Sequence, residues 1–429
     1  MKRDDWLERS VIRDMSEGVM IIGVEGAIEY LNPAAEDILK VSAEKLTGVK
    51  FAKAFFECDE NDAFNQAVLD AVYDTNVKQY NLVPYFTGED TRQLRMLTSR
   101  LRDEGGRTDL IVMLDDITEM VELKIRYAEQ VTAMMESMVR ALSTAIDERS
   151  RYNGNHTRNM VKMAEAFLDW MEQTDHPWRF EAEKRRAFLM SVWLHDVGKL
   201  TVPLEVMDKA TRLGPALERI EERFARIRLL DRIAALEGRI TEAEREARAA
   251  EWDARLALIQ RINAMGYLPE ETLAEVQRLA EARYVDEANR EQPLLTPDEI
   301  EGLSIRKGTL TKDERSVMQS HATVTRIILS QIEFPRPYAM VVDWASSHHE
   351  LLTGSGYPNH RRGDEIPREV RLLTILDIFE ALTARDRPYK KPMPLDRALD
   401  TLHSMCAEGS LDSEILGMFE ESRAWDAIL

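Results

Sequence analysis

Apolar helical stretches of this sequence carry a histidine or an aspartate on the side that the apolar spacing marks as buried. Asp377 lies within "VRLLTILDIFEAL", in line with Leu373. In another stretch, His321 shares a helical face with Val317 and Ile328. Burying an unpaired charge is costly, whereas polar groups that converge on a metal ion are stabilised by it. The pattern predicts a helical domain that buries a shared polar cluster.

Two further segments offer partners for such a cluster. His156 precedes apolar residues at helical spacing, and "VWLHDVGKL" ends an apolar helix with His195 and Asp196. A carboxylate beside an imidazole can bridge two metal ions while the imidazole binds one of them. Gly198 is able to stop the helix, and Lys199 lies close enough to meet an anionic oxygen. Each residue alone is typical of a satisfied polar group in a core, but together they favour shared metal.

The stretch "SSHHELLTGSGYP" places His348 and His349 side by side before a loop. Glycine at position 356 allows close backbone approach, Tyr357 offers a stacking or hydrogen-bonding face, and Pro358 stiffens the turn. The stretch therefore predicts two metal ligands followed by a substrate-facing loop. The remaining histidines lie beside turns or polar neighbours and are expected at the surface: His176, His360 and His403.

The composition excludes some classes of partner. The chain has 429 residues with a formal net charge of −20, which argues against wide binding to DNA because phosphate neutralisation needs clustered cations. The two cysteines, Cys58 and Cys406, lie far apart and are expected to be reduced thiols. The apolar runs are too short to span a bilayer, so we expect no membrane partner and a cytoplasmic protein.

Residues 1–118 mix short strand-like runs with short helices. Five predicted strands, with a helix that opens at Pro33 after the second, predict a small antiparallel α+β sensor domain. This order, with "NPAAEDIL" and the exit "DDITE", resembles the PAS family. The sensor's ligand is not predicted, and haem held by histidine is not expected because His156 is the first histidine of the chain.

Residues 119–146 predict a linking helix with a long apolar stripe. A lone helix cannot bury such a stripe, so it favours a homodimer in which the PAS domain and a parallel coiled coil bring two chains together. Packing of the stripe on the helix's own domain is the alternative. The stripe consists of Met120, Leu123, Tyr127, Val131, Met134, Met138, Leu142 and Ala145.

Residues 214–300 are rich in Glu, Arg and Ala and hold no histidine or cysteine. Two amphipathic helices are followed by a third in "LPEETLAEVQRLAEARYV", with Pro269 at its first turn. Thr296 and Glu299 have the spacing of a capping box before a further short helix. The segment is interpreted as a charged helical insertion that packs or holds a signalling partner.

The order of these motifs, His156, "HDVGK", His321, "HHE", "GYP" and "DIFEALTARDRPY", resembles the HD-GYP family, a branch of the HD phosphohydrolases. The resemblance covers residues 140–210 and 304–400. It implies a multidomain chain: an α+β PAS sensor, a linking coiled-coil helix, and an all-α HD-GYP domain over 147–405 with the helical insertion, followed by a C-terminal helical tail over 406–429. It implies a metal-dependent phosphodiesterase that hydrolyses cyclic di-GMP to pGpG or GMP.

The resemblance also implies the roles of individual residues. Two divalent ions, iron or manganese, are expected, because Tyr152 stands where some members carry a glutamate that binds a third iron. Asp196 and Lys199 are implied in catalysis. Thr353 replaces the family's usual aspartate, and its effect on the loop is open. The implied metal ligands are His156, His195, Asp196, His321, His348, His349 and Asp377.

The substrate contacts implied by the resemblance are Lys199, Gly356, Tyr357, Pro358, Arg387 and Lys390. The last two lie in the locally basic "ARDRPYKKP", whose charges alternatively only solvate a helix exit. Two other functions remain open. One is hydrolysis of another cyclic dinucleotide, and the other is a signalling scaffold without catalysis, which the residue at position 353 and the insertion motivate.

Overall fold

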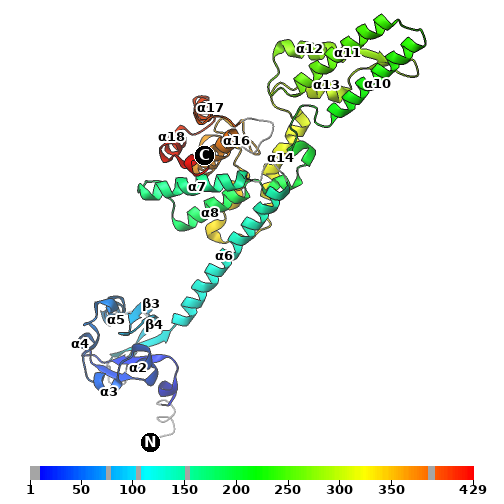
Figure 1. Cartoon of the computed structure of the whole chain (residues 1–429). Helices are drawn as coiled ribbons and strands as arrows, with labels where there is room; N and C mark the ends of the chain where they lie inside the picture. Colours follow the sequence, from blue (N-terminus) through cyan, green and yellow to red (C-terminus); the bar gives the residue numbers. More distant parts are fainter. Residues whose placement is uncertain (1–9, 74–78, 103–107, 150–154, 385–391) are drawn as a thin grey trace. The chain divides into compact units, whose positions relative to one another are not determined.

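The computed structural model describes residues 10–73, 79–102, 108–149, 155–384 and 392–429 (Figure 1). The chain forms two compact units, Met1–Met134 and Met135–Leu429. The boundary between them falls inside helix α6, Thr118–Arg149. Within the described ranges, no helix combines the length and apolar character that a membrane crossing requires.

The first unit is built on a five-stranded sheet whose neighbouring strands are all antiparallel, in the order β2-β1-β5-β4-β3. This confirms the predicted antiparallel α+β domain. Helix α2 begins where predicted, because the side chain of Asn32 accepts a hydrogen bond from the backbone of Ala35. The strands are β1 Gly18–Ile22, β2 Ile28–Leu31, β3 Gln79–Phe86, β4 Thr91–Arg102 and β5 Thr108–Asp116; the helices are α2 Pro33–Leu39, α3 Ala43–Leu46, α4 Phe51–Phe55 and α5 Asp62–Tyr73.

The two faces of this sheet differ. One face packs on the helices around a cluster of aromatic rings that includes Phe64 and Tyr85. On the other face, Tyr80, Leu97 and Met113 are direct cross-strand neighbours on β3, β4 and β5. Tyr80 is 73% exposed. The first unit therefore has a closed core and an apolar row on its opposite face.

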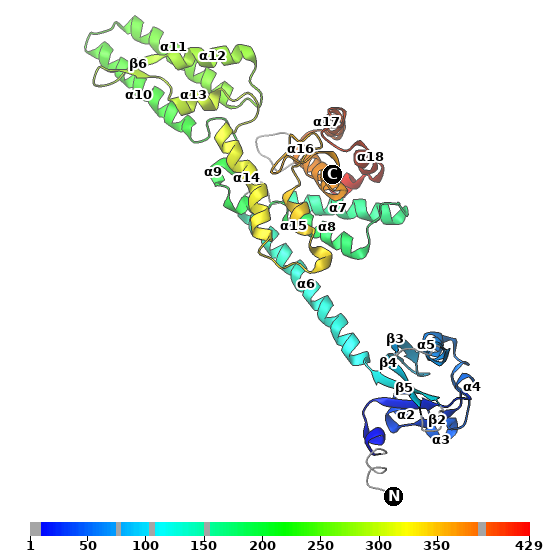
Figure 2. The ribbon, with the colours of Figure 1, turned by 180° about the vertical axis from the view of Figure 1, so that it is seen from behind.

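The second unit is a helical domain, as predicted. The helices around its core are α7 His156–Gln173, α8 Ala182–Leu194, α14 Lys312–Leu329, α15 Val341–Ser346, α16 Arg368–Thr383, α17 Leu395–Ala407 and α18 Ser413–Ser422 (Figures 1 and 2). The predicted C-terminal tail belongs to the same core, because Phe379 of α16 packs against Phe419 and Trp425 with ring centroids 5.2 and 5.8 Å apart.

The linking helix α6 divides into two parts. Near its start the predicted stripe is exposed, with Leu123 61% and Tyr127 68% exposed. Near its end, Val139 and Ile146 are buried in the core of the second unit. After Met134 the predicted stripe is confirmed only at Leu142, which packs against the core, since Met138 and Ala145 are exposed and Val139, Ser143 and Ile146 are buried. The buried face of this part of α6 is therefore shifted by about one residue from the predicted stripe.

The insertion, α10 to α13, has a core of its own. Figure 2 shows its helices grouped beside one another. The capping box of Thr296 and Glu299 is confirmed. The predicted continuation of the third helix is wrong, because α12 ends at Glu281 and Arg283–Val285 forms a strand paired with Glu291–Pro293. The helices are α10 Ala216–Leu236, α11 Glu242–Asn263, α12 Glu270–Glu281 and α13 Pro297–Leu303.

Candidate metal centre

Five helices of the second unit bring histidines and aspartates together at one place. His156 is the first residue of α7, His195 and Asp196 follow α8, His321 lies on α14, His348 and His349 follow α15, and Asp377 lies on α16. Three overlapping groups among these residues have ligand atoms within 4.8 Å of one another. We call these seven residues the candidate metal centre.

Three of the histidines are oriented in the same way. The Nδ1 atoms of His195, His321 and His348 lie 2.7, 2.6 and 2.7 Å from the backbone carbonyl oxygen three residues earlier. A carbonyl oxygen only accepts, so each Nδ1 carries the proton and donates it. The Nε2 lone pair of each ring is therefore left for a ligand, which is how metal-binding histidines are commonly fixed.

The carboxylate of Asp196 lies between two sets of these nitrogens. Its Oδ2 is 3.2 Å from Nε2 of His195 and 3.6 Å from Nε2 of His156. Its Oδ1 is 3.4 Å from Nε2 of His321 and 3.9 Å from Nε2 of His348. Each oxygen thus faces its own pair of imidazoles, which is the arrangement of a carboxylate that bridges two ions.

Several hydrogen-bond acceptors of the centre face one another, an arrangement that suits a bound cation. Oδ1 of Asp196 is buried and has no hydrogen-bond partner among the residues that the structure describes, although unprotonated imidazole nitrogen lies beside it. Two acceptors facing each other in a buried site are unfavourable, and a cation between them removes the conflict. The Nε2 atoms of His156 and His195 are 3.2 Å apart, and those of His321 and His348 are 3.5 Å apart. Two nitrogens bound to one ion lie about 3.0 to 3.4 Å apart.

Asp377 connects the two sides of the centre a second time. Its Oδ1 lies 3.4 Å from Nε2 of His156, and its Oδ2 lies 3.6 Å from Nδ1 of His349. Burial works to raise the pKa of Asp377, but the hydrogen bond from His156 and the nearby His349 hold that pKa far below its usual value. This carboxylate is therefore ionised, as a metal ligand must be.

The histidines of the centre differ in their pKa values. Burial lowers the pKa of His321, and that of His349 to about 3. Burial and the adjacent His349 hold the pKa of His348 well below its ordinary value. These three rings are neutral at pH 7 and can donate a lone pair. Burial would also lower the pKa of His156, but hydrogen bonds to Asp377 and Glu380 raise it to about 10, so this ring carries a proton on Nε2 that a metal ion would have to displace.

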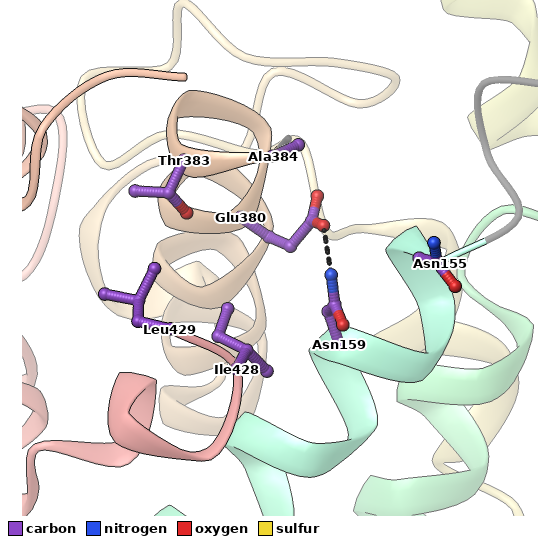
Figure 3. A pocket seen from close by; sticks show the side chains of 7 residues that line it. All are labelled: Asn155, Asn159, Glu380, Thr383, Ala384, Ile428 and Leu429. Atoms are coloured by element: carbon purple, nitrogen blue, oxygen red, sulfur yellow. Dashed lines mark hydrogen bonds between the residues drawn. The ribbon is translucent and has the colours of Figure 1, made fainter. Parts of the chain in front are cut away.

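Glu380 is a part of the site that the sequence analysis missed. Its Oε2 lies 2.6 Å from Nδ1 of His156, and its Oε1 accepts a hydrogen bond of 3.0 Å from Asn159 (Figure 3). Glu380 and Asn159 also line a cavity of about 170 Å³. The signal was present, because Glu380 follows Asp377 by three residues and so lies on the same helical face. An acid at that spacing can hold a histidine in place.

Lys199 lies against the carboxylate of Asp196. Its Nζ donates to Oδ2 at 2.6 Å, and the lysine side chain is 18% exposed. Burial would raise the pKa of Asp196, but His195 and Lys199 hold it well below its ordinary value. Lys199 thus places a positive charge at the edge of the centre, where it can meet an anion.

Gly198 serves close packing rather than ending a helix, which corrects the sequence interpretation. Helix α8 ends at Leu194, and residues Val197–Thr201 form a 3-10 helix, η2. A Cβ atom on Gly198 would collide with the backbone oxygen of His321 on α14.

The predicted position of Val317 beside His321 is also wrong, since Val317 is 40% exposed and the buried neighbours are Ala322, Thr325 and Leu329.

The loop after His349 is held against the centre. A Cβ atom on Gly356 would collide with the backbone oxygen of His349, so the loop approaches as closely as predicted. The ring of Tyr357 lies 4.6 Å from that of His349. Burial, followed by the charges of Asp377 and Asp196, raises the pKa of Tyr357, so its hydroxyl stays protonated. Glu350 accepts hydrogen bonds from the backbone of residues 359 and 361 and so ties the loop down.

Other predicted positions lie away from the cluster or cannot be placed. Thr353 is exposed and its hydroxyl is 2.8 Å from that of Ser355. Of the histidines expected at the surface, His360 and His403 are exposed and His176 is half-buried. The predicted substrate contacts Arg387 and Lys390, and Tyr152, lie outside the described residues.

Comparison with protein families identifies both folds. Residues 13–122 match the PAS fold, and residues 293–415 match the HD domain. These matches confirm the two resemblances drawn from the sequence. The HD match contains His321, the adjacent pair at 348–349 and Asp377, while His156 and the "HD" dipeptide lie before the insertion and outside it. Folding brings the two segments together across the insertion.

Several curated relatives are similar to part of the chain. The 3'3'-cGAMP-specific phosphodiesterase 3 of Vibrio cholerae is 42% identical over 94 residues, 22% of this chain and 20% of that protein. The cyclic di-GMP phosphodiesterase response regulator RpfG of Xanthomonas campestris pv. campestris is 32% identical over 189 residues, 41% of this chain and 47% of that protein. A cyclic di-GMP phosphodiesterase of Thermotoga maritima is 36% identical over 109 residues, 25% of this chain and 28% of that protein.

The chain therefore spans less than half the length of these relatives. Among solved structures, the PAS domain of BvgS from Bordetella pertussis aligns with 31% of this chain and 99% of that domain, at 18% identity and a TM-score of 0.25.

Proposed function

We propose that this chain, with its PAS fold and its HD domain, is a metal-dependent phosphodiesterase that hydrolyses cyclic di-GMP to pGpG or GMP. The observation that carries the proposal is Asp196, whose two carboxylate oxygens face separate pairs of imidazole nitrogens. The names of the relatives from Xanthomonas campestris and Thermotoga maritima support the substrate class.

The proposed ligands divide into two sides. His156, His195 and Asp377 hold one ion, and His321, His348 and His349 hold the other, while Asp196 contributes to both. When bound there, two divalent ions, iron or manganese, would lower the pKa of water and would neutralise charge on phosphoryl oxygens.

The other side chains have roles that follow from their positions. Lys199 adds a positive charge beside Asp196, where it stabilises negative charge that develops on the phosphodiester. Tyr357 presents a protonated hydroxyl and a ring face beside His349, which suits the positioning of a nucleotide. Gly356 and Pro358 shape the loop that carries it, and Arg387 and Lys390 are proposed to contact the dinucleotide.

The proposal is tested with purified protein loaded separately with iron and with manganese. We expect cyclic di-GMP to be converted to pGpG or GMP, which chromatography resolves. No product with either metal would contradict it. A second candidate substrate is 3'3'-cGAMP, because the similar relatives include proteins named as specific for it. Comparison of kcat/KM for the two dinucleotides under identical loading decides between them.

The alternative of a scaffold without catalysis predicts a different metal content. The buried oxygen of Asp196 and the paired imidazoles predict about two ions per chain when metal is supplied. A content below about one ion per chain, together with absent turnover, would favour the scaffold. Plasma mass spectrometry gives the metal content, and a turnover assay of the same sample gives the activity.

The chain is further proposed to form a homodimer through the PAS fold and helix α6. Leu123 and Tyr127 are exposed on α6, and Tyr80 and Leu97 lie in the apolar row on the outer sheet face. Exposed apolar side chains in such a row are typical of an interface. Light scattering should give twice the chain mass for the wild type and a lower mass for a Leu123→Asp, Tyr127→Asp variant. A monomeric wild type would contradict the proposal.

The insertion is proposed to hold a signalling partner. Near the end of α10, Leu229, Ile233 and Leu236 are 60, 45 and 80% exposed and follow one another at helical spacing. Replacing all three by glutamine should abolish recovery of a partner from cells while leaving turnover unchanged. Equal recovery of partners by the two proteins would contradict this role.

A further inference from the structure

Arg149, the last residue of helix α6, contacts the backbone of the turn formed by residues 196–202, which contains η2. Arg149 donates from Nη1 to the carbonyl oxygen of Lys199 at 3.2 Å and from Nη2 to that of Val202 at 3.0 Å. Lys199 lies inside η2, the 3-10 helix that directly follows Asp196, and Val202 is the residue after its last turn. The carbonyl of Lys199 also accepts a hydrogen bond of 3.1 Å from the backbone of Val202, so Arg149 adds a second donor to it, and a cation at this end of a helix is favourable.

The turn is held on its other side by α14. The hydroxyl of Thr325 accepts a hydrogen bond from the backbone of Gly198 at 3.0 Å and donates to the carbonyl of His195 at 3.0 Å. The start of the turn, with the metal ligands, is therefore fixed by Thr325, while Arg149 holds its end. The two contacts divide the segment into a metal-binding part and a part that carries Lys199.

We propose that Arg149 is a positioning residue that places Lys199 for the reaction. The inference rests on the proposed function and assigns a further residue to it. The guanidinium fork contacts the carbonyls of Lys199 and Val202 at once, and lysine cannot reproduce this planar geometry. Helix α6 begins at Thr118, two residues after strand β5 ends at Asp116. The helix that follows the PAS fold in the chain thus ends at the arginine that contacts η2.

The test compares Arg149→Ala with Arg140→Ala in the full chain. Arg140 lies on the same helix, is 55% exposed and pairs with Glu136 at 3.8 Å, so its variant removes the same charge without touching η2. We expect Arg149→Ala to retain the metal content of the wild type and to lose about ten- to a hundredfold in kcat. Arg140→Ala should keep the kcat of the wild type. Loss of metal from Arg149→Ala would overturn the proposal, because the residue would then act on the centre as a whole.

A double-variant cycle separates positioning of Lys199 from general stabilisation. If Arg149 acts through Lys199, adding Arg149→Ala to Lys199→Ala should lower kcat no further. Losses that multiply in the double variant would overturn the proposal.

Amide hydrogen exchange provides a readout that does not depend on turnover. Exchange in the peptide that spans residues 198–202 should rise in Arg149→Ala and stay unchanged in Arg140→Ala. Unchanged exchange in both variants would overturn the proposal. If the wild type hydrolyses no cyclic dinucleotide, the proposed function fails, while the exchange measurement still decides whether Arg149 holds the turn.

Discussion

The helices around the candidate metal centre and the helices of the insertion both bury polar side chains, but they satisfy them differently. In the insertion, Glu299 accepts two hydrogen bonds from Arg223 at 2.8 and 3.0 Å and one from the backbone of Thr296. In the centre, Asp196 has a buried oxygen that receives no hydrogen bond from the described part of the chain. The difference separates a polar group that stabilises the fold from one that is arranged for a ligand.

The largest effect is expected where the buried charge is unsatisfied. Asp196→Asn keeps the shape of the side chain but removes the charge that faces four imidazoles. We expect the metal content to fall below one ion per chain and hydrolysis to fall by about 10³-fold or more, because the charge stabilisation that metals provide is lost. Metal analysis and initial rates measure this. An Asp196→Asn variant that binds two ions and turns over normally would remove the distinction between the two regions.

Glu299→Gln, the corresponding substitution in the insertion, should lower the stability of the insertion and leave the metal content unchanged. Glu299→Gln breaks a buried pair with Arg223 and should lower the free energy of opening of the insertion by about 3 kcal/mol. Segment-resolved hydrogen exchange measures it, and metal content serves as the control. A loss of metal from Glu299→Gln would show that the insertion's polar core is part of the site.

The pH dependence of the insertion follows from the same residue. Burial would raise the pKa of Glu299, but Arg223 and Thr296 hold it below its usual value. A carboxyl whose folded pKa is depressed stabilises the fold above its unfolded pKa of about 4.3, and this contribution is lost as the pH falls below that value. Exchange protection of α13 should therefore decline below about pH 4.3 in the wild type. Glu299→Gln should show a smaller decline, and equal declines would contradict the assignment.

A smaller effect on metal binding is expected for Glu380, whose buried carboxylate is hydrogen-bonded to His156. Glu380→Gln should weaken metal binding or activity by about ten- to a hundredfold, because His156 loses the charge that orients it. Glu369→Gln is the matched control, since Glu369 is buried on the same helix and pairs with Lys184 at 2.6 Å. Equal metal affinities for the two variants would argue against a role for Glu380 in the centre.

The smallest effect is expected at Thr353, which stands where the family resemblance leads one to expect an aspartate. Its side chain is exposed and its hydroxyl contacts that of Ser355, so Thr353→Asp should change stability by no more than about 0.5 kcal/mol. Activity should stay within about twofold. A gain of tenfold or more in kcat/KM would show that the loop is impaired as it stands.

The sequence predicted much of the fold and most of the cluster for a physical reason. Apolar spacing marks the buried face of a helix, so a charged residue such as Asp377 on that face is conspicuous. Strand and turn signals likewise placed β1 to β5. These inferences depend on local periodicity, which one chain shows by itself.

The rest depends on contacts between distant segments. The hydrogen bond of Glu380 to His156 joins residues 224 positions apart, and the role of Gly198 is set by the backbone of α14. After Met134 the face of α6 that joins the core of the second unit differs from the face that its own periodicity suggests. The strand at Arg283–Val285 was missed because a run of only three residues does not distinguish a strand from a helix end.

The carboxylate of Asp196 is proposed to lie between two metal ions. Anomalous X-ray scattering from crystals of manganese-loaded protein tests it most directly. We expect two peaks about 3.5 to 4 Å apart, one on the side of His156 and His195 and one on the side of His321 and His348. A single peak, or none in protein shown to be loaded, would contradict it.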